Sequence, residues 1–430
     1  MSTPNDVVLS RKIRSIRATE WLNFFLADVQ AGVGPFVAAY LAATGWSPNK
    51  VGLALTLGGI VTVLLQTPAG AIVDVVRHKR TVLAAGIVTV ALGAAILVSR
   101  TTTVSVGLSQ VLIGGAGAFL GTTVAAITLG IVGQRTFDRQ FGRNQSFNAA
   151  GNVASALLFA AVGYSLGNRA IFLAAIGLAI PTLIALAAID PKQIDYGQAR
   201  ASSRHSHSDT VSPFRILSSD SVLLAFCVSA FLFHLANAAM LPELGELLSK
   251  GQARSAAPFM SACVIVTQIV ITLSAAWIGK RAGVRGRKGL LLLGFGVLPV
   301  RGVLYALTQS ASALIAIQVL DGVANAIFGV VSTLVVVDRT RGTARFNLAQ
   351  GALATTVGIG AALSNAVGGE LVQRFGYNAS FLGLASVAAL AFLVLWRAVP
   401  ETLPGLTRER RREAGSAATS VQLIKPEAEF

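Results

Sequence analysis

Two acidic residues in long apolar stretches are the positions most able to do chemistry. Of the 19 acidic side chains, Asp28 and Asp321 lie nearest the middle of such a stretch. A charge is expensive in a low-dielectric medium, so a carboxyl group placed there indicates a function or a specific partner. Asp28 has no evident basic partner in the sequence. It is therefore a candidate for proton coupling, and a hydrogen bond to a neighbouring helix is the alternative.

Asp321 has a candidate partner in Arg301. The two residues lie about ten positions on either side of a turn near Ser310 and Ala311. At a rise of about 1.5 Å per residue, antiparallel helices would hold them at the same depth. This placement predicts a structural ion pair between Arg301 and Asp321. Direct proton coupling or substrate binding by Asp321 is the other interpretation.

Amide and imidazole side chains form stripes at helical spacing. Asn148 and Asn152 are four residues apart, and His234 and Asn237 are three apart. Such stripes are typical of a polar pathway through a membrane protein, although hydrogen bonds between helices explain them equally well. The candidate pathway residues are Gln30, Gln110, Asn148, Asn152, His234, Asn237, Gln318 and Asn325. Asp28 and Gln30 differ by about 200° around a helix, so both cannot face the pathway squarely.

These residues belong to twelve predicted membrane-spanning helices. The chain has 430 residues, of which 53% are hydrophobic and 13% are charged, whereas a soluble domain carries about 25% charged residues. The predicted spans are 19–43, 50–73, 81–99, 104–132, 145–166, 170–189, 221–248, 256–279, 289–308, 311–337, 346–372 and 378–397. They predict an all-α membrane protein with two six-helix bundles at 19–189 and 221–397. A tail (1–18), a linker (190–220) and a second tail (398–430) complete the chain.

Basic residues alternate between the connections. With the N-terminus placed inside, the cytoplasmic segments hold 28 of the 35 Lys and Arg residues, the external connections hold 6, and Arg301 lies within a span. This bias predicts that both termini are cytoplasmic in a bacterial inner membrane. The formal charge of +16 therefore reflects membrane topology, and we expect the partners to be a lipid bilayer and a small molecule, with no nucleic acid.

The remaining metal-binding residue types give weak signals. His205 and His207 lie two residues apart in the Ser-rich linker, a pattern more typical of a solvated segment than of a metal site. Cys227 and Cys263 fall inside apolar stretches and are interpreted as small core residues. A thiol site for a soft metal or metalloid is the alternative. We expect no cofactor and no resident metal, and no removable signal peptide is evident.

The two halves of the chain resemble each other. Residues 110–121 and 318–329 agree at seven of twelve positions, at an offset of 208. An offset of 207 places Phe24, Gln30 and Pro35 over Phe231, Asn237 and Pro242. Two offsets that agree to one residue indicate an internal duplication, which places a cleft between the halves.

The connection after the second predicted span carries a recognisable motif. Gly70 and Asp74 are followed by Arg77 and Arg80, in the pattern Gly-x-x-x-Asp and then basic residues. A weaker copy runs from Gly279 to Lys288. With the six-plus-six organisation, this resembles the major facilitator superfamily of secondary transporters over the whole membrane region. In that superfamily the motif is a latch that holds the cytoplasmic side shut, so the resemblance implies a gating role for these four residues.

The sequence departs from the proton-coupled exporters of that superfamily in two places. Gln110 stands ahead of Gly114 where those exporters usually have Arg, and the fifth span lacks their Gly-Pro pair. Any proton carrier would then be another group, with Asp28 and Asp321 as the candidates.

The expected function is secondary active transport of a small solute by alternating access, without enzymatic activity and as a monomer. The sequence favours efflux of an amphipathic, toxic or drug-like compound, because the pathway is apolar, amide-lined and poor in charge. Proton-linked uptake of an organic solute, export of a metal or metalloid, and a non-transporting membrane sensor or scaffold are the alternatives.

Overall fold

A computed structural model describes residues 4–27, 34–197, 220–251, 253–341 and 345–403. Within these ranges every regular element is helical. The first half contains α1 (Pro4–Ala27), α2 (Gly34–Ala43), α3 (Pro48–Val75), α4 (Lys79–Ser99), α5 (Thr103–Val132), α6 (Gln134–Leu166), α7 (Asn168–Ala187) and the short 3-10 helix η2 (Pro191–Gln193). The second half contains α10 (Ser221–Asn237), α11 (Met240–Gly251), α12 (Ala253–Arg285), α13 (Lys288–Leu307), α14 (Ala311–Thr340), α15 (Phe346–Phe375) and α16 (Tyr377–Ala398).

Eleven helices in the described residues are long and apolar enough to cross a bilayer, with α10 and α11 together as one of them. These eleven helices correspond to the second to twelfth predicted spans. The first predicted span, 19–43, corresponds to the end of α1 and to α2, on either side of residues 28–33, which lie outside the described residues. Asp28 and Gln30 fall in that gap. The protein is thus a multi-pass, all-α membrane protein.

Several helices extend beyond the predicted spans. The fifth span was expected at 145–166 but α6 begins at Gln134, and α12 continues past the predicted end at 279 to Arg285. Hydropathy marks only the apolar part of a helix, whereas backbone hydrogen bonding continues into water. The connection expected at 133–144 is therefore a single residue, Gly133, whose φ of 76° turns the chain sharply between α5 and α6.

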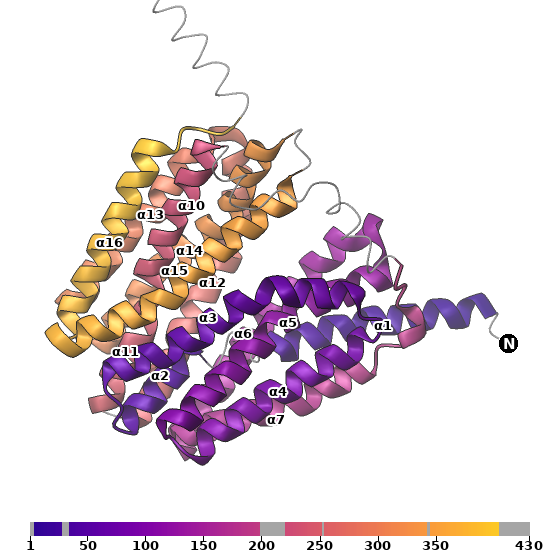
Figure 1. The fold of residues 1–430 in the computed structure, drawn as a ribbon, viewed down its shortest axis with the longest axis horizontal. Coiled ribbons are helices and arrows are strands. Elements are labelled where there is room, and N and C mark those ends of the chain that lie inside the picture. Colours follow the sequence, from indigo (N-terminus) through magenta and orange to yellow (C-terminus); the bar gives the residue numbers. More distant parts are fainter. Residues whose placement is uncertain (1–3, 28–33, 198–219, 252, 342–344, 404–430) are drawn as a thin grey trace, which may run out of the picture.

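The helices form two bundles of six spans each, α1–α7 and α10–α16, which lie at an angle to each other (Figure 1). The pairs α1 with α2 and α10 with α11 each count as one span. The bundles touch mainly along α3 with α15, α6 with α12 and α2 with α11, and α12 also makes smaller contacts with α2 and α7. The start of α1 and the end of α16 both lie on the side where the bundles diverge (Figure 1). We call this side the terminal side, and the opposite side, where the bundles meet, the junction side.

Small residues bring the backbones together on the junction side. A Cβ on Gly52 of α3 would overlap the carbonyl oxygen of Asn365 on α15. One turn further, Thr56 Oγ1 donates a hydrogen bond to the carbonyl of Ala362 at 2.7 Å. Close backbone approach of this kind is how helices gain packing contacts in lipid, where the hydrophobic effect does not drive them together.

The internal duplication is visible in the helix bounds. Helices α5 and α14 are each 30 residues long, and both bounds of α14 lie 208 positions after those of α5. The turns at Gly167 and Gly376, which join α6 to α7 and α15 to α16, have φ values of 90° and 83°. The repeat detected in the sequence therefore extends to the lengths of helices and to their turns.

Candidate functional site

A cavity of about 180 Å³ lies where the two bundles meet. It is lined by residues of α2, α6, α11, α12 and α14, so both halves of the molecule contribute to its wall. The lining residues are Phe36, Asn152, Ser155, Ala156, Phe159, Leu241, Val264, Thr267, Gln268 and Asp321. We call this space the central pocket.

Asp321 is the acidic group of the central pocket. Its Oδ1 lies 2.8 Å from Nη1 of Arg301 and accepts a hydrogen bond from Asn325 Nδ2 at 2.9 Å. Its Oδ2 accepts from Thr267 Oγ1 on α12 at 3.2 Å. The side chain keeps 10% of its surface exposed. Three donors thus compensate the carboxylate for the water that it loses in the protein interior.

Arg301 lies behind Asp321, away from the pocket, and is 1% exposed. It donates through Nε to the hydroxyl of Tyr305 at 3.1 Å and through Nη2 to Gln318 Oε1 at 3.2 Å. Nη1 also donates to Asn237 Oδ1. The guanidinium group is thus held by one carboxylate and three neutral acceptors, which satisfies the desolvated charge.

Helix periodicity explains how this network forms. Gln318, Asp321 and Asn325 follow i, i+3 and i+7 on α14, so they share one face. Arg301 and Tyr305 are one turn apart on α13, which packs against α14. Asn237 is the last residue of α10. The structure therefore brings together Arg301 and Asp321 as well as three of the candidate pathway residues.

The opposite wall of the central pocket comes from α6. Asn152 lines the pocket, and its Nδ2 donates to Asn148 Oδ1 at 3.3 Å. Asn148 in turn donates to the carbonyl of Asn23 on α1 at 3.4 Å. Further along α6, Phe159 packs edge-on against Phe36 of α2, with ring centroids 5.4 Å apart. This wall offers an aromatic surface beside amide groups.

Two other candidate pathway residues lie away from the pocket. Gln110 is buried between α5 and α3, where its Oε1 lies against Gly58. His234 is enclosed by Phe233 and Phe328, with ring centroids 5.2 and 4.8 Å away. Its Nε2 has no hydrogen-bond partner within the part of the chain that the structure describes. Both residues contribute to helix packing within one bundle in this conformation.

The residues of the predicted latch lie on the terminal side. A Cβ added to Gly70 would meet no heavy atom of the described residues within 4 Å, so none of the described helices packs closely on this glycine in this conformation. Arg80 donates to the carbonyls of Leu186 and Ala187 at the end of α7, each at 3.2 Å. Asp74 and Arg77 lie at the end of α3 and just after it. Residues 342–344, which precede α15, are outside the described residues.

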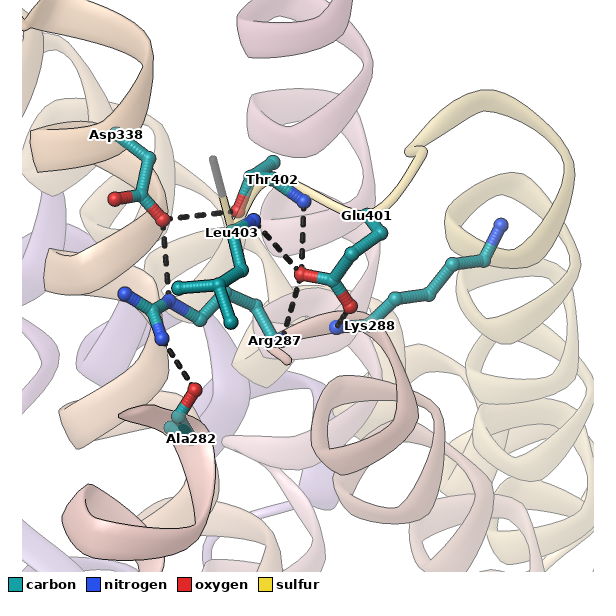
Figure 2. Close-up of polar contacts among 7 residues, drawn as sticks. All are labelled: Ala282, Arg287, Lys288, Asp338, Glu401, Thr402 and Leu403. Atoms are coloured by element: carbon teal, nitrogen blue, oxygen red, sulfur yellow. Dashed lines mark hydrogen bonds and ion pairs between the residues drawn. The ribbon is translucent and has the colours of Figure 1, made fainter. Parts of the chain in front are cut away.

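The equivalent turn of the second bundle carries a denser polar cluster (Figure 2). Arg287 and Asp338 are both buried and form an ion pair at 3.1 Å. The carboxylate of Glu401, beyond the end of α16, accepts from the backbone N–H groups of Arg287 and Lys288 at 2.8 and 3.1 Å. It thereby satisfies unpaired donors at the start of α13, where a helix favours negative charge. Asp338 also accepts from Thr402 Oγ1 at 3.3 Å.

Some buried polar residues were not identified from the sequence. Thr267 and Gln268 line the central pocket from α12. Glu20 pairs with Arg143 at 3.0 Å near the terminal side. Glu243 on α11 is 2% exposed. The sequence signal for Glu243 is that an acidic residue lies inside the predicted apolar span 221–248.

The described residues contain no group of three or more His, Cys, Asp or Glu side chains that could hold a metal ion. Cys227 and Cys263 are both buried free thiols. His205 and His207 lie outside the described residues.

Comparisons with known proteins agree with this architecture. The sequence model of the Major Facilitator Superfamily matches residues 21–300 and 259–427. MFS-type transporters from two strains of Mycobacterium tuberculosis are each 39% identical over 402 residues, which cover 93% of this chain and 96% of theirs.

Solved structures with a similar fold are more distant in sequence. The nucleoside transporter NupG superposes with a TM-score of 0.73 at 15% identity, covering 90% of this chain and 99% of that one. A bacterial homologue of the human lysosomal transporter Spinster was solved in an inward-facing and unoccupied conformation. It superposes with a TM-score of 0.72 at 12% identity, covering 93% of this chain and 98% of that one. These likenesses concern the fold alone.

Two six-helix bundles with a polar pocket at their junction are the architecture of a membrane transporter. The chain belongs to the Major Facilitator Superfamily.

Proposed function

We propose that this protein is a secondary active transporter that exports a small, uncharged, amphipathic solute through the central pocket. The observation that carries the proposal is the Arg301–Asp321 pair at the pocket wall, with its 2.8 Å contact and its three neutral acceptors. The pair leaves the pocket polar but without net charge. A binding site at the interface of two repeats is what alternating access requires.

The pocket wall indicates the class of solute. Phe36 and Phe159 offer an aromatic surface, which favours a planar or apolar face. Asn152, Thr267 and Gln268 offer donors and acceptors for a polar edge. The volume of about 180 Å³ is below the roughly 300–1,000 Å³ of pockets for drug-sized ligands. A compact solute with one apolar face and one hydrogen-bonding edge fits this description.

The bundles diverge on the terminal side, and this divergence supports a transport cycle in which the two sides open in turn. If both termini are cytoplasmic, as the charge bias predicts, this conformation opens toward the cytoplasm. Gly70 would then make its helix contact, and Asp74 would reach the start of α15, only after the cycle closes that side. A solute that enters from the cytoplasm and leaves on the junction side would be exported. Proton-linked uptake is the same cycle run in the opposite direction.

Protons are the proposed coupling ion. Protonation of Asp321 would weaken its contact with Arg301 at the pocket wall, and Asp28 remains a second candidate from the sequence. The proposed unit is a monomer in a bacterial inner membrane, since one chain supplies both bundles and the whole pocket.

The experiment is a growth and accumulation screen in a compound-sensitive bacterial host. Cells that express the wild-type chain should accumulate less of at least one compound than cells without it. Asn152→Ala removes a pocket amide, which should weaken the apparent affinity about tenfold, equivalent to about 1.4 kcal/mol. Gln134→Ala, exposed at the start of the same helix, is the matched control and should behave as wild type.

The outcome that rejects the proposal is equally specific. If Asn152→Ala and Gln134→Ala give the same profile for every compound that the wild type excludes, the central pocket does not bind the solute. Greater accumulation in cells with the wild-type chain would instead support uptake.

A further inference from the structure

Glu243 is a buried carboxylic acid that the pocket does not use. It lies on α11, inside the predicted span 221–248, and is 2% exposed. Its Oε1 accepts a hydrogen bond from Ser380 Oγ of α16 at 3.0 Å and lies against the backbone of Gly368 on α15. Its Oε2 is buried and has no hydrogen-bond partner among the described residues. The side chain is therefore enclosed by three helices of the second bundle.

The described surroundings of Glu243 supply no positive charge. On its own helix the nearby titratable group is Glu246, which accepts from Tyr377 OH of α16 at 3.4 Å. On α15 the cation nearest this end is Arg374, which is exposed and pairs with Glu370. An isolated carboxylate in a dry site costs several kcal/mol, and such a group takes up a proton instead.

The other helices packed on α11 also contribute apolar contacts where they are described. Gly245, two residues after Glu243, lies against Met260 of α12 and Ala39 of α2. The titratable residue of α2 is Tyr40, and its ring packs on Phe172. The uncharged form of Glu243 is the form that these contacts accommodate.

We propose that Glu243 is a proton-binding site that links protonation to closure of the junction side. In the conformation described here Glu243 carries a proton. When the junction side opens, α11 moves relative to α15 and α16 and water reaches the carboxyl group between them; the O–H bond breaks, the proton passes to water and a carboxylate remains. The reverse steps accompany closure, so one proton is bound per closure. This inference rests on the proposed transport function and adds a coupling residue to it.

The position of α11 connects Glu243 to both the pocket and the other bundle. Helix α10 ends at Asn237, which bonds Arg301, and α11 begins three residues later at Met240. Within this break, Ala239 N–H donates to Ser364 Oγ at 2.9 Å. Helix α11 packs against α2 of the first bundle. A movement of α11 about this break would therefore change the pocket network, the junction contact and the surroundings of Glu243 together.

The first experiment measures the proton directly. In the purified, substrate-free protein, infrared difference spectra across a pH titration should contain the C=O stretch of a protonated, buried carboxyl group. Glu243→Gln should abolish that band, and Glu243→Asp should shift it. Glu370→Gln, an exposed acid on α15, is the control and should leave the band unchanged. Loss of the band in the control alone, or its survival in Glu243→Gln, would overturn the proposal.

The second experiment measures the conformation. Spin labels at Ala43 and Gln309, both exposed on the junction side, report its opening as a longer distance once Cys227 and Cys263 are replaced by Ala. The ratio of molecules with the junction side closed to those with it open should fall as pH rises. The fall should be about tenfold per pH unit over the range in which the two conformations differ by one bound proton. Glu243→Gln, which resembles the protonated acid, should remove this dependence.

Neither experiment requires a known solute. A negative result for Glu243 can therefore be told apart from a failure of the transport proposal. A wild-type distance distribution that does not change with pH overturns the role of Glu243 even if the chain exports a compound. A pH dependence that survives in Glu243→Gln but disappears in Asp321→Asn would assign the coupling to the central pocket instead.

Discussion

Arg301 and Asp321 show how a membrane protein keeps opposite charges in an apolar interior. The guanidinium group is almost fully buried, while the carboxylate retains a small exposed face in the central pocket. Removal of either partner would leave an unpaired charge in a low dielectric. The contribution of the pair is therefore measured best when both partners are changed.

At the residue scale, Arg301→Met and Asp321→Leu should each destabilise the protein by about 3–5 kcal/mol. The double variant should recover much of this loss, because no uncompensated charge remains. Thermal unfolding in detergent, with folding yield as a second readout, measures both effects. The control is the exposed pair of Arg374 and Glu370, whose removal should cost about 0.3–0.5 kcal/mol. A double variant as unstable as the sum of the singles would show that the two charges do not interact.

At the scale of the element, the junction of α12 and α13 depends on one glycine. Gly286 has a φ of 96°, and a Cβ there would overlap the carboxylate of Glu401. The turn therefore fits only glycine while Glu401 caps α13 (Figure 2).

Gly286→Ala should accordingly lower the free energy of unfolding by more than about 1 kcal/mol. Gly289→Ala is the matched control, since Gly289 lies in the first turn of α13 and a Cβ there meets nothing within 4 Å. That change should be neutral or stabilising by up to about 1 kcal/mol. Unfolding midpoints in detergent compare the two variants, and equal midpoints would contradict this account of the turn.

At the scale of the whole molecule, glycines near opposite ends of α3 should have opposite effects on the conformational equilibrium. A Cβ on Gly52 would collide with the carbonyl oxygen of Asn365 in this conformation, whereas a Cβ on Gly70 would meet no described atom within 4 Å. Gly52→Ala should therefore shift the protein away from closure of the junction side. Gly70→Ala should favour the conformation with the junction side closed, because the added methyl group obstructs the helix contact proposed for the conformation with the terminal side closed. The distance between spin labels at Ala43 and Gln309 tests both variants. If this distance changes in the same direction in Gly52→Ala and Gly70→Ala, the gating role proposed for the Gly70 motif is wrong.

The orientation in the membrane is a second prediction at this scale. Reporter fusions at Ser165 and Ser310 should behave as external, and a fusion at Ser206 should behave as cytoplasmic. The reason is the 28-to-6 distribution of Lys and Arg between the two sets of connections. The reversed pattern of reporter activity would place the open side of this conformation outside the cell.

The sequence by itself determined the features that depend on composition along one dimension. Apolar length located the spans, and the offset of 208 anticipated the equal bounds of α5 and α14. Counting residues from the turn placed Arg301 and Asp321 at one depth, and they lie 2.8 Å apart in the structure. Depth along a helix follows from residue number, because the rise per residue is constant.

Only the tertiary structure decided which way each helix faces. Gln110 lies against α3 and His234 between two Phe rings, whereas Thr267 and Gln268 reach the central pocket. Hydropathy does not distinguish these rotations, because lipid and helix interfaces are both apolar. Glu243 was overlooked for the same reason, since its burial depends on the packing of α11 against α15 and α16. Rotation and tilt are set by contacts between helices distant in the chain, and these contacts exist only in the folded bundle.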